Sequence, residues 1–314
     1  MPERGDRVAW VFPGQGSQEV GMGRDLAEAS RIARRVLETA DAVLGYPLSR
    51  LCSEGPDDTL RQTAYAQPAI FAVSLACLEA ARELGGLWEE HPAFVAGHSL
   101  GEYTALVAAR ALDLEEGLRL VQERGRLMQE AAEANPGTMA ALIGLDDADV
   151  AELCTSTGAE LCNLNSPGQV VIGGSVEVVE AAMVAARERG AQRAVRLKVS
   201  GAFHTSLTAP AAQGMARAAA DASLRDPAIP VVVNGTGLPA PSASDIREEL
   251  VYQLTHPVRW RESVEFMAGA GVCDFVEIGP GRVLSGLIRR IVPVITPMQD
   301  SQATRLDQYQ AIVP

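Results

Sequence analysis

The stretch Ala93–Gly101, AFVAGHSLG, decides the fold class of this 314-residue chain. A short apolar run ends in Gly97-His98-Ser99-Leu100-Gly101, and Leu100–Leu112 continues with apolar residues at helical spacing. These five residues match G-x-S-x-G, in which a serine lies on a tight turn between a strand and a helix. Glycine permits such a turn, which exposes the serine hydroxyl. We therefore predict a strand–turn–helix unit with Ser99 as a catalytic nucleophile.

Strands and helices alternate outward from this unit. Apolar runs predict strands at Val8–Phe12, Ile229–Val233 and Asp274–Ile278, and helical periodicity covers Arg24–Leu44 and Gln67–Leu84. Such alternation is typical of a mostly parallel sheet with helices on both faces. Leu238–Ser244 predicts a loop, and the tail after Pro297 has no clear periodicity and is expected to pack loosely or wrap the surface. We expect a large α/β-hydrolase-like domain formed by residues 1–134 and 201–314.

The segment 135–200 has a different order of elements. Strands are predicted at Thr138–Leu145, Glu160–Asn165, Gln169–Gly173 and Arg193–Val199, with helices at Ala148–Thr157 and Val176–Arg189. The order β-α-β-β-α-β is that of ferredoxin-like domains. We therefore expect a small ferredoxin-like domain at 135–200, inserted into the large one.

Composition limits the compartment and the partners. The net charge of −13 argues against a nucleic-acid partner, which needs a basic face. No run of about 18 uninterrupted apolar residues predicts a membrane span, and Met1–Asp6 lacks the apolar segment of a secretory signal. The five cysteines are scattered without C-x-x-C spacing, as in a reduced compartment. We expect a cytoplasmic monomer.

A serine nucleophile needs a base, and histidine is the usual one. His98 is the neighbour of Ser99, and adjacent side chains at such a turn point apart. His91 precedes a proline in a polar loop and is expected to be solvated. His204 lies between a predicted strand and a helix, where functional side chains gather. The sequence favours His204 as the base and leaves His256 as the alternative.

The turn after the first predicted strand has two possible interpretations. Gly14-Gln15-Gly16 resembles the start of a dinucleotide-binding G-x-G-x-x-G loop. The third glycine of that pattern is replaced by Glu19, so this interpretation is rejected.

Six motifs occur in one order along nearly the whole chain, from about residue 8 to 295, and together they carry a resemblance to a known family. They are Phe12-Pro13-Gly14-Gln15-Gly16-Ser17-Gln18, Gly97-His98-Ser99-Leu100-Gly101-Glu102, Gln122-Glu123-Arg124-Gly125, Asn165-Ser166-Pro167-Gly168-Gln169, Gly201-Ala202-Phe203-His204, and the stretch from Gln253-Leu254 to Pro257-Val258-Arg259-Trp260. The chain resembles the malonyl-CoA:acyl carrier protein transacylases and the acyltransferase domains of polyketide synthases.

The resemblance implies a role for each matching residue. Ser99 would be acylated and His204 would be its base, oriented by the backbone carbonyl of Gln253. Gln15 would help to position an oxyanion hole completed by the N–H of Leu100. The role implied for Arg124 is to hold the free carboxylate of a malonyl group, which suits a planar guanidinium. Asn165 would line the same cleft.

The implied reaction is a ping-pong transfer from malonyl-CoA to the phosphopantetheine thiol of an acyl carrier protein, for fatty acid or polyketide synthesis. No metal or bound cofactor is expected. The resemblance also implies malonyl preference, because Phe203 would narrow the space beside the substrate's α-carbon, where methylmalonyl users carry serine. Discrimination against one methyl group is worth only about 1–3 kcal/mol, so the preference is not absolute.

Two other functions stay open at this stage. A hydrolase that clears acyl groups from carrier proteins would share the nucleophile but would have no use for Arg124. A non-catalytic docking subunit of a synthase would not need the Gln15, Ser99, Arg124 and His204 set. Carrier proteins are acidic, as this chain is, so a local cationic patch is expected, with Arg193, Arg196, Lys198, Arg282, Arg289 and Arg290 as its candidates.

Overall fold

The computed structural model describes residues 7–84, 92–293 and 310–313, and its main element is a six-stranded sheet. The strand order is β10-β9-β1-β2-β7-β8. The four inner strands are parallel, and each outer strand is antiparallel to its neighbour. The strands are β1 (Arg7–Phe12), β2 (Phe94–Gly97), β7 (Val231–Val232), β8 (Pro239–Ala240), β9 (Val272–Ile278) and β10 (Gln310–Val313). The mixed α/β fold with a mostly parallel sheet is therefore confirmed.

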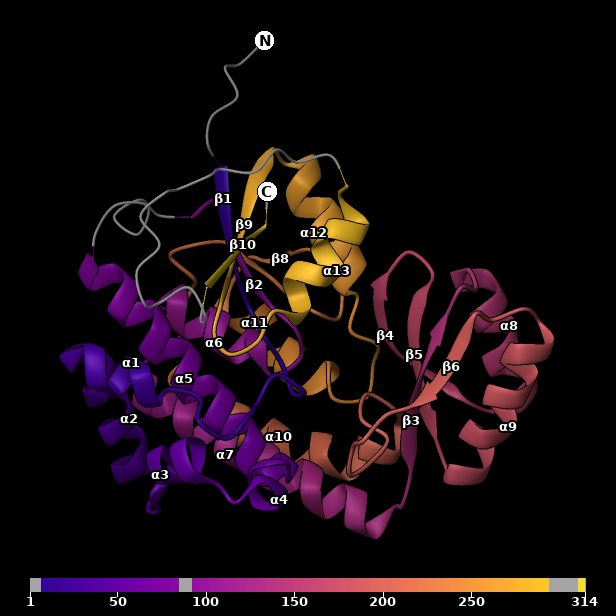
Figure 1. Cartoon of the computed structure of the whole chain (residues 1–314), viewed down its shortest axis with the longest axis horizontal. Helices are drawn as coiled ribbons and strands as arrows, with labels where there is room; N and C mark the ends of the chain where they lie inside the picture. Colours follow the sequence, from indigo (N-terminus) through magenta and orange to yellow (C-terminus); the bar gives the residue numbers. More distant parts are fainter. Residues whose placement is uncertain (1–6, 85–91, 294–309, 314) are drawn as a thin grey trace.

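Helices cover both faces of this sheet (Figure 1). Successive side chains of a strand point to opposite faces, and β1 accordingly places Trp10 and Phe12 in one hydrophobic core and Ala9 and Val11 in the other. The larger core involves the helices α1 (Arg24–Ala29), α2 (Arg31–Leu44), α3 (Leu48–Glu54), α4 (Asp57–Leu60), α5 (Thr63–Leu84), α6 (Gly101–Ala108), α7 (Leu114–Ala134), α10 (Ala209–Asp221) and α11 (Ala243–Tyr252). The smaller core lies under α12 (Trp260–Gly269) and α13 (Val283–Ile291).

The helix α5 is the central element of the larger core. It is long and apolar enough to cross a membrane, and it is the only such helix in the described part of the chain. However, 83% of its most apolar window, within Thr63–Glu83, is buried inside the protein. That burial is typical of a core helix.

A second, four-stranded sheet lies beside the first, at the right of Figure 1. Its order is β4-β5-β3-β6, all antiparallel. One face packs on two helices through its own core, and the other face contributes Met139, Cys162 and Val171 to the larger core. The elements in chain order are β3 (Thr138–Ile143), α8 (Asp147–Thr157), β4 (Glu160–Ser166), β5 (Gln169–Gly174), α9 (Val176–Glu188) and β6 (Arg193–Arg196).

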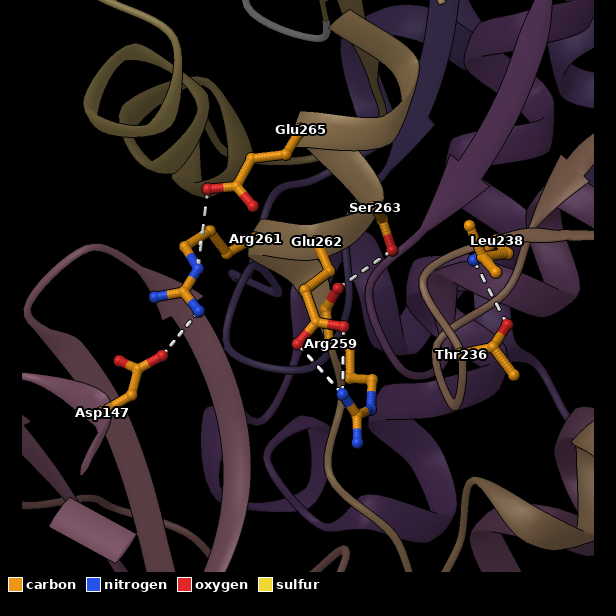
Figure 2. A network of polar contacts seen from close by, with 8 residues as sticks. All are labelled: Asp147, Thr236, Leu238, Arg259, Arg261, Glu262, Ser263 and Glu265. Atoms are coloured by element: carbon orange, nitrogen blue, oxygen red, sulfur yellow. Dashed lines mark hydrogen bonds and ion pairs between the residues drawn. The ribbon is translucent and has the colours of Figure 1, made fainter. Parts of the chain in front are cut away.

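Backbone and ionic contacts connect the two sheet regions. Val258 lies beside β4, accepting from Leu164 N at 2.9 Å and donating to Cys162 O at 2.8 Å. Figure 2 shows Arg261 of α12 reaching Asp147 at the start of α8, with an Nη2–Oδ2 distance of 2.6 Å. These contacts fix the edge of the small sheet against the segment that leads into α12.

Several predicted boundaries are wrong, for local reasons. The helix predicted over Arg24–Leu44 is broken at Ser30, whose hydroxyl accepts from Ala33 N and starts α2. Leu238–Ser244 is not all loop, because it contains β8 and Ser242, the N-cap of α11.

Other elements are shorter than predicted. The strand β3 ends at Ile143, β6 ends at Arg196, and β7 is only Val231–Val232. The helix after Ser99, α6, ends at Ala108. Gln310–Val313 in the tail forms β10 on β9, whereas the rest of the tail expectation, like those for Met1–Asp6 and His91, concerns residues outside the described ones.

Candidate active site

Ser99 occupies the strained turn between β2 and α6. Its φ is +51°, a backbone conformation that residues other than glycine rarely adopt. The turn is so tight that a Cβ on Gly97 would lie 1.9 Å from the carbonyl carbon of Gly101, and one on Gly101 would lie 2.1 Å from Phe12 O. Both positions therefore require glycine, and the helix α6 starts directly behind the serine.

The hydroxyl of Ser99 is paired with His204, which comes 105 positions later in the chain. Ser99 Oγ and His204 Nε2 are 2.8 Å apart, and His204 Nδ1 is 2.6 Å from the backbone carbonyl oxygen of Gln253. Because a carbonyl only accepts, Nδ1 carries the ring proton. In the neutral ring, Nε2 is then free to accept the Ser99 proton, which makes the pair a hydroxyl nucleophile with its base.

Burial keeps His204 neutral. The side chain is 4% exposed, and desolvation, followed by the nearby Arg124 cation, lowers its pKa from 6.5 to about 3. The hydrogen bond to Gln253 O opposes this shift because it stabilises the protonated ring. At neutral pH His204 is therefore ready to accept a proton.

Arg124 of α7 lies directly beside the nucleophile. Its Nη2 donates to Ser99 Oγ at 3.0 Å and to Gln253 Oε1 at 2.9 Å, and its Nη1 donates to Gln67 Oε1 at 2.6 Å. The residue is 1% exposed, and its Nε has no hydrogen-bond partner among the described residues. Burial lowers the pKa of Arg124, since water no longer stabilises the cation. A buried guanidinium with an unused donor is suited to an anionic group on a bound molecule.

Gln15 is tied to Arg124 through two residues that the sequence did not single out. Gln67 Nε2 donates to Thr63 Oγ1 at 2.9 Å, and Thr63 Oγ1 donates to Gln15 Oε1 at 2.8 Å. Thr63 and Gln67 are one turn apart on α5 and are fully buried. In the sequence, only the i, i+4 spacing of these two polar residues pointed to the pair, and such spacing occurs on many helices without a role in a site.

The N–H of Leu100 belongs to the start of α6. The first N–H groups of a helix have no partner within that helix, and they favour negative charge. Leu100 is the N-cap of α6 and follows Ser99 directly, so its N–H is the backbone donor next to the nucleophile.

A buried carboxylate lies behind the turn that carries Ser99. Glu102 of α6 is fully buried and accepts from Asn234 N at 2.7 Å, from Asn234 Nδ2 and from Gln253 Nε2 at 2.8 Å. Asn234 Oδ1 in turn accepts from Ser99 N at 2.6 Å. Glu102 was part of a quoted motif, but the sequence assigned it no role, and Asn234 gave no signal at all.

These groups open into a cleft of about 360 Å³ between the two sheet regions. Gln15, Ser99, Leu100, Arg124, His204 and Phe203 all line it. Its apolar wall combines Phe203 with side chains from both regions, and its cations include Arg61 and Lys198. The other apolar residues of the lining are Met128, Met139, Leu197 and Val199.

The expected position of Asn165 in the cleft needs correction. It does not line the cleft; its Oδ1 lies 2.9 Å from Nε2 of His98, which does. Asn163, two residues earlier on β4, lines the cleft instead.

The alternative base, His256, has other contacts. Its ring stacks on Tyr252 with centroids 3.5 Å apart, and its Nδ1 is 2.8 Å from Tyr252 O. His204 is the histidine that the structure pairs with Ser99.

The candidate cationic patch reaches the cleft through one residue. Of its six members only Lys198 lines the cleft. Arg196 pairs with Glu180 at 3.2 Å, and Arg290 donates to Gln169.

Comparison with known proteins agrees with this arrangement. The acyl transferase domain family matches residues 9–302. The malonyl CoA-acyl carrier protein transacylase of Escherichia coli K12 is 45% identical over 294 residues, covering 92% of this chain and 94% of that protein.

Two solved structures agree as closely. The acyl-carrier-protein-S-malonyltransferase of Bartonella henselae has a TM-score of 0.89 at 44% identity, covering 92% of this chain and 93% of that one. A malonyl-transacylase solved in complex with the acyl carrier protein of a type II polyketide synthase has a TM-score of 0.88 at 45% identity, covering 91% and 93%. The chain therefore belongs to the acyl transferase domain family, together with the malonyl CoA-acyl carrier protein transacylases.

Proposed function

We propose that this chain transfers the malonyl group of malonyl-CoA, through an ester on Ser99, to the phosphopantetheine thiol of an acyl carrier protein. One observation carries the proposal: the buried guanidinium of Arg124 lies 3.0 Å from the nucleophile. A malonyl group brings a second carboxylate for that cation, whereas a simple acyl group does not. The names of the relatives support the same donor and acceptor, in fatty acid or polyketide synthesis.

The first half-reaction follows from the positions of the side chains. His204 Nε2 accepts the Ser99 proton while Oγ attacks the thioester carbonyl carbon. The N–H of Leu100 donates to the developing oxyanion, and Gln15 helps to position this oxyanion hole. When the C–S bond breaks, His204 returns the proton to the sulfur of coenzyme A, which leaves as the thiol.

The second half-reaction reverses these steps. The thiol of the carrier protein loses its proton to His204 and attacks the acyl-serine carbonyl, and Ser99 recovers a proton as it leaves. The Gln253 carbonyl keeps His204 oriented in both half-reactions and stabilises the imidazolium that forms in each. Such an exchange of thioester for ester needs no metal or redox group.

Two parts of the cleft set specificity in this proposal. Arg124 holds the free carboxylate of the malonyl group with charge-assisted hydrogen bonds. Phe203, which lines the cleft and is 5% exposed, limits the space for a methyl group on the α-carbon. A carrier protein would approach over Lys198 and Arg61, which line the cleft, since its surface is acidic.

We further propose that the large sheet and its helices form an α/β-hydrolase-like domain of residues 1–134 and 201–314. Residues 135–200 would be a ferredoxin-like domain, which the strand order β4-β5-β3-β6 supports. A cytoplasmic monomer completes the proposal. Light scattering on the purified chain tests the monomer directly.

The test of the reaction is intact mass after brief mixing with malonyl-CoA, with Ser99→Ala as the matched control. A gain of one malonyl group in the wild type alone is the expected result. No adduct with accumulation of free malonate would identify a hydrolase instead, and no adduct without turnover would point to a docking subunit or another acyl donor.

A further inference from the structure

The carboxylate of Glu102 accepts three hydrogen bonds behind the nucleophile, and the reaction steps above do not use it. It lies on α6, three residues after Ser99, and is 0% exposed. One oxygen accepts from the backbone and the side-chain amide of Asn234, and the other accepts from Gln253 Nε2. These two amides belong to residues far apart in the sequence, and both contact groups at the reaction centre.

An ionised carboxylate can only accept hydrogen bonds, so both amides present their NH₂ groups to it. Asn234 presents its NH₂ to Glu102 and to the carbonyl oxygen of Gly97, at 2.7 Å from the latter, and its Oδ1 faces the N–H of Ser99 at 2.6 Å. Gln253 presents its NH₂ to Glu102, and its Oε1 faces Arg124 Nη2 at 2.9 Å. Glu102 therefore supports the nucleophile's backbone and the guanidinium at the same time.

The side chain of Gln253 also separates the two charges. Arg124 contacts Gln253, and Gln253 contacts Glu102, so the amide stands between cation and anion. A direct ion pair with Glu102 would occupy the donors of Arg124. With the Gln253 amide between them, Glu102 is a buried counter-charge for Arg124, and the Nε of Arg124 has no hydrogen-bond partner among the described residues.

We propose that Glu102 is a positioning residue for acyl transfer, acting through Asn234 on the Ser99 backbone and through Gln253 on Arg124. The effect on Arg124 rests on the proposed malonyl transfer, whereas the effect on Ser99 holds for any acyl donor.

The charge of Glu102 depends on its surroundings. Burial raises its pKa from 4.5 to about 7, and the hydrogen bonds from Asn234 and Gln253, followed by the Arg124 cation, oppose that shift. The neighbouring Glu249 on α11 carries a carboxyl whose pKa burial and Glu102 raise to about 9, so it is neutral when Glu102 ionises. Tyr103 on the same helix, with its pKa raised by burial, also stays neutral. Protonated Glu102 would be a donor, so one of the hydrogen bonds that it accepts from Asn234 and Gln253 would be lost.

The test is Glu102→Gln, which keeps the shape and removes the acceptor-only character. The amide that replaces the carboxylate has only one acceptor oxygen, so its NH₂ would face the NH₂ of either Asn234 or Gln253. It therefore cannot accept a hydrogen bond from both residues. Glu277→Gln is the matched control, because Glu277 is also 0% exposed and accepts from Ser285 N at 2.7 Å, at the start of α13.

Three readouts separate positioning from mere stability. The first is the rate at which a fluorophosphonate probe, which forms a P–O bond to Ser99 and releases fluoride, labels folded protein. We expect Glu102→Gln to slow labelling roughly 10- to 100-fold, since small misplacements at a reacting centre cost rates of this order. This readout does not depend on the natural acyl donor, so it remains valid if malonyl-CoA proves not to be the substrate.

The second readout is kcat/KM for malonyl-CoA against acetyl-CoA, whose ratio should fall in Glu102→Gln because Arg124 loses its support. The third is the pH profile of kcat/KM. The wild type should lose activity as pH falls through about 7, the pKa of Glu102, because the pKa of His204 is far lower, at about 3. Glu102→Gln should lack this limb, and Glu277→Gln should keep all three wild-type behaviours.

The proposal is overturned if Glu102→Gln lowers only the melting temperature and leaves the labelling rate, the substrate ratio and the pH limb unchanged. An unchanged labelling rate with an altered ratio would refute the action on Ser99. Failure of the wild type to accept malonyl, with slow labelling of Glu102→Gln, would refute the proposed function and leave the action on Ser99 standing.

Discussion

Replacement of Arg124 by alanine tests the central feature of the proposed site. Arg124 makes three kinds of contact: to Gln67 and Gln253 within the protein, to Ser99 Oγ, and, in the proposed complex, to the malonyl carboxylate. Loss of the first two affects every acyl donor alike. Only the third distinguishes malonyl from acetyl, so the ratio of the two kcat/KM values isolates it.

The size of the effect follows from burial. Arg124 is 1% exposed, so a carboxylate bound to it is shielded from water, and the charge-assisted contact contributes about 1.5–3 kcal/mol. At about 1.4 kcal/mol per factor of ten, the malonyl-to-acetyl ratio should fall roughly 10- to 150-fold. Acetyl transfer should fall less than malonyl transfer or should rise.

The assay is release of coenzyme A from each donor at saturating carrier protein. Arg126→Ala is the control, because Arg126 lies two residues further on α7 and pairs on the surface with Glu123 and Glu130. Its ratio should match the wild type. Equal loss with both donors in Arg124→Ala would refute the carboxylate contact and reduce Arg124 to a support for Ser99.

Three further predictions follow. Phe203→Ser should raise kcat/KM for methylmalonyl-CoA relative to malonyl-CoA roughly 5- to 150-fold, since one methyl group is worth about 1–3 kcal/mol; an unchanged ratio measured by coenzyme A release would contradict the steric argument. Glu249 binds its proton more tightly when folded, with a pKa of about 9 against 4.5, so its contribution to stability is lost as pH rises through this window. Glu249→Gln should therefore have a higher melting temperature than the wild type at alkaline pH. A difference in melting temperature between the two proteins that stays constant from acid to alkaline pH would contradict this prediction. Gly97→Ala should abolish folding or labelling of Ser99, because its Cβ would lie 1.9 Å from the carbonyl carbon of Gly101, whereas Gly269→Ala on α12 meets nothing within 4 Å and should gain about 0.5–1 kcal/mol in urea unfolding.

The turn that carries Ser99 and the class of fold were predictable because their signals are local. Apolar residues in Val8–Phe12 and Ala93–Gly97 predict buried parallel strands, and glycines on both sides of Ser99 meet the steric demand of a turn only a few residues long. Boundaries failed where one side chain decides them, as at Ser30 and Ser242, whose hydroxyls start helices inside stretches interpreted otherwise.

The sequence by itself determined that Ser99 is presented on a strand–turn–helix unit of a mostly parallel α/β sheet, and its motifs nominated His204 and Arg124. Only the tertiary structure decided that His204 rather than His256 meets the serine, that Asn165 supports His98 from outside the cleft, and that Glu102 lies at the centre of the polar network. The physical reason is that hydrogen-bond direction, burial and pKa depend on groups more than a hundred positions apart, such as Glu102 and Asn234, which folding alone brings into contact.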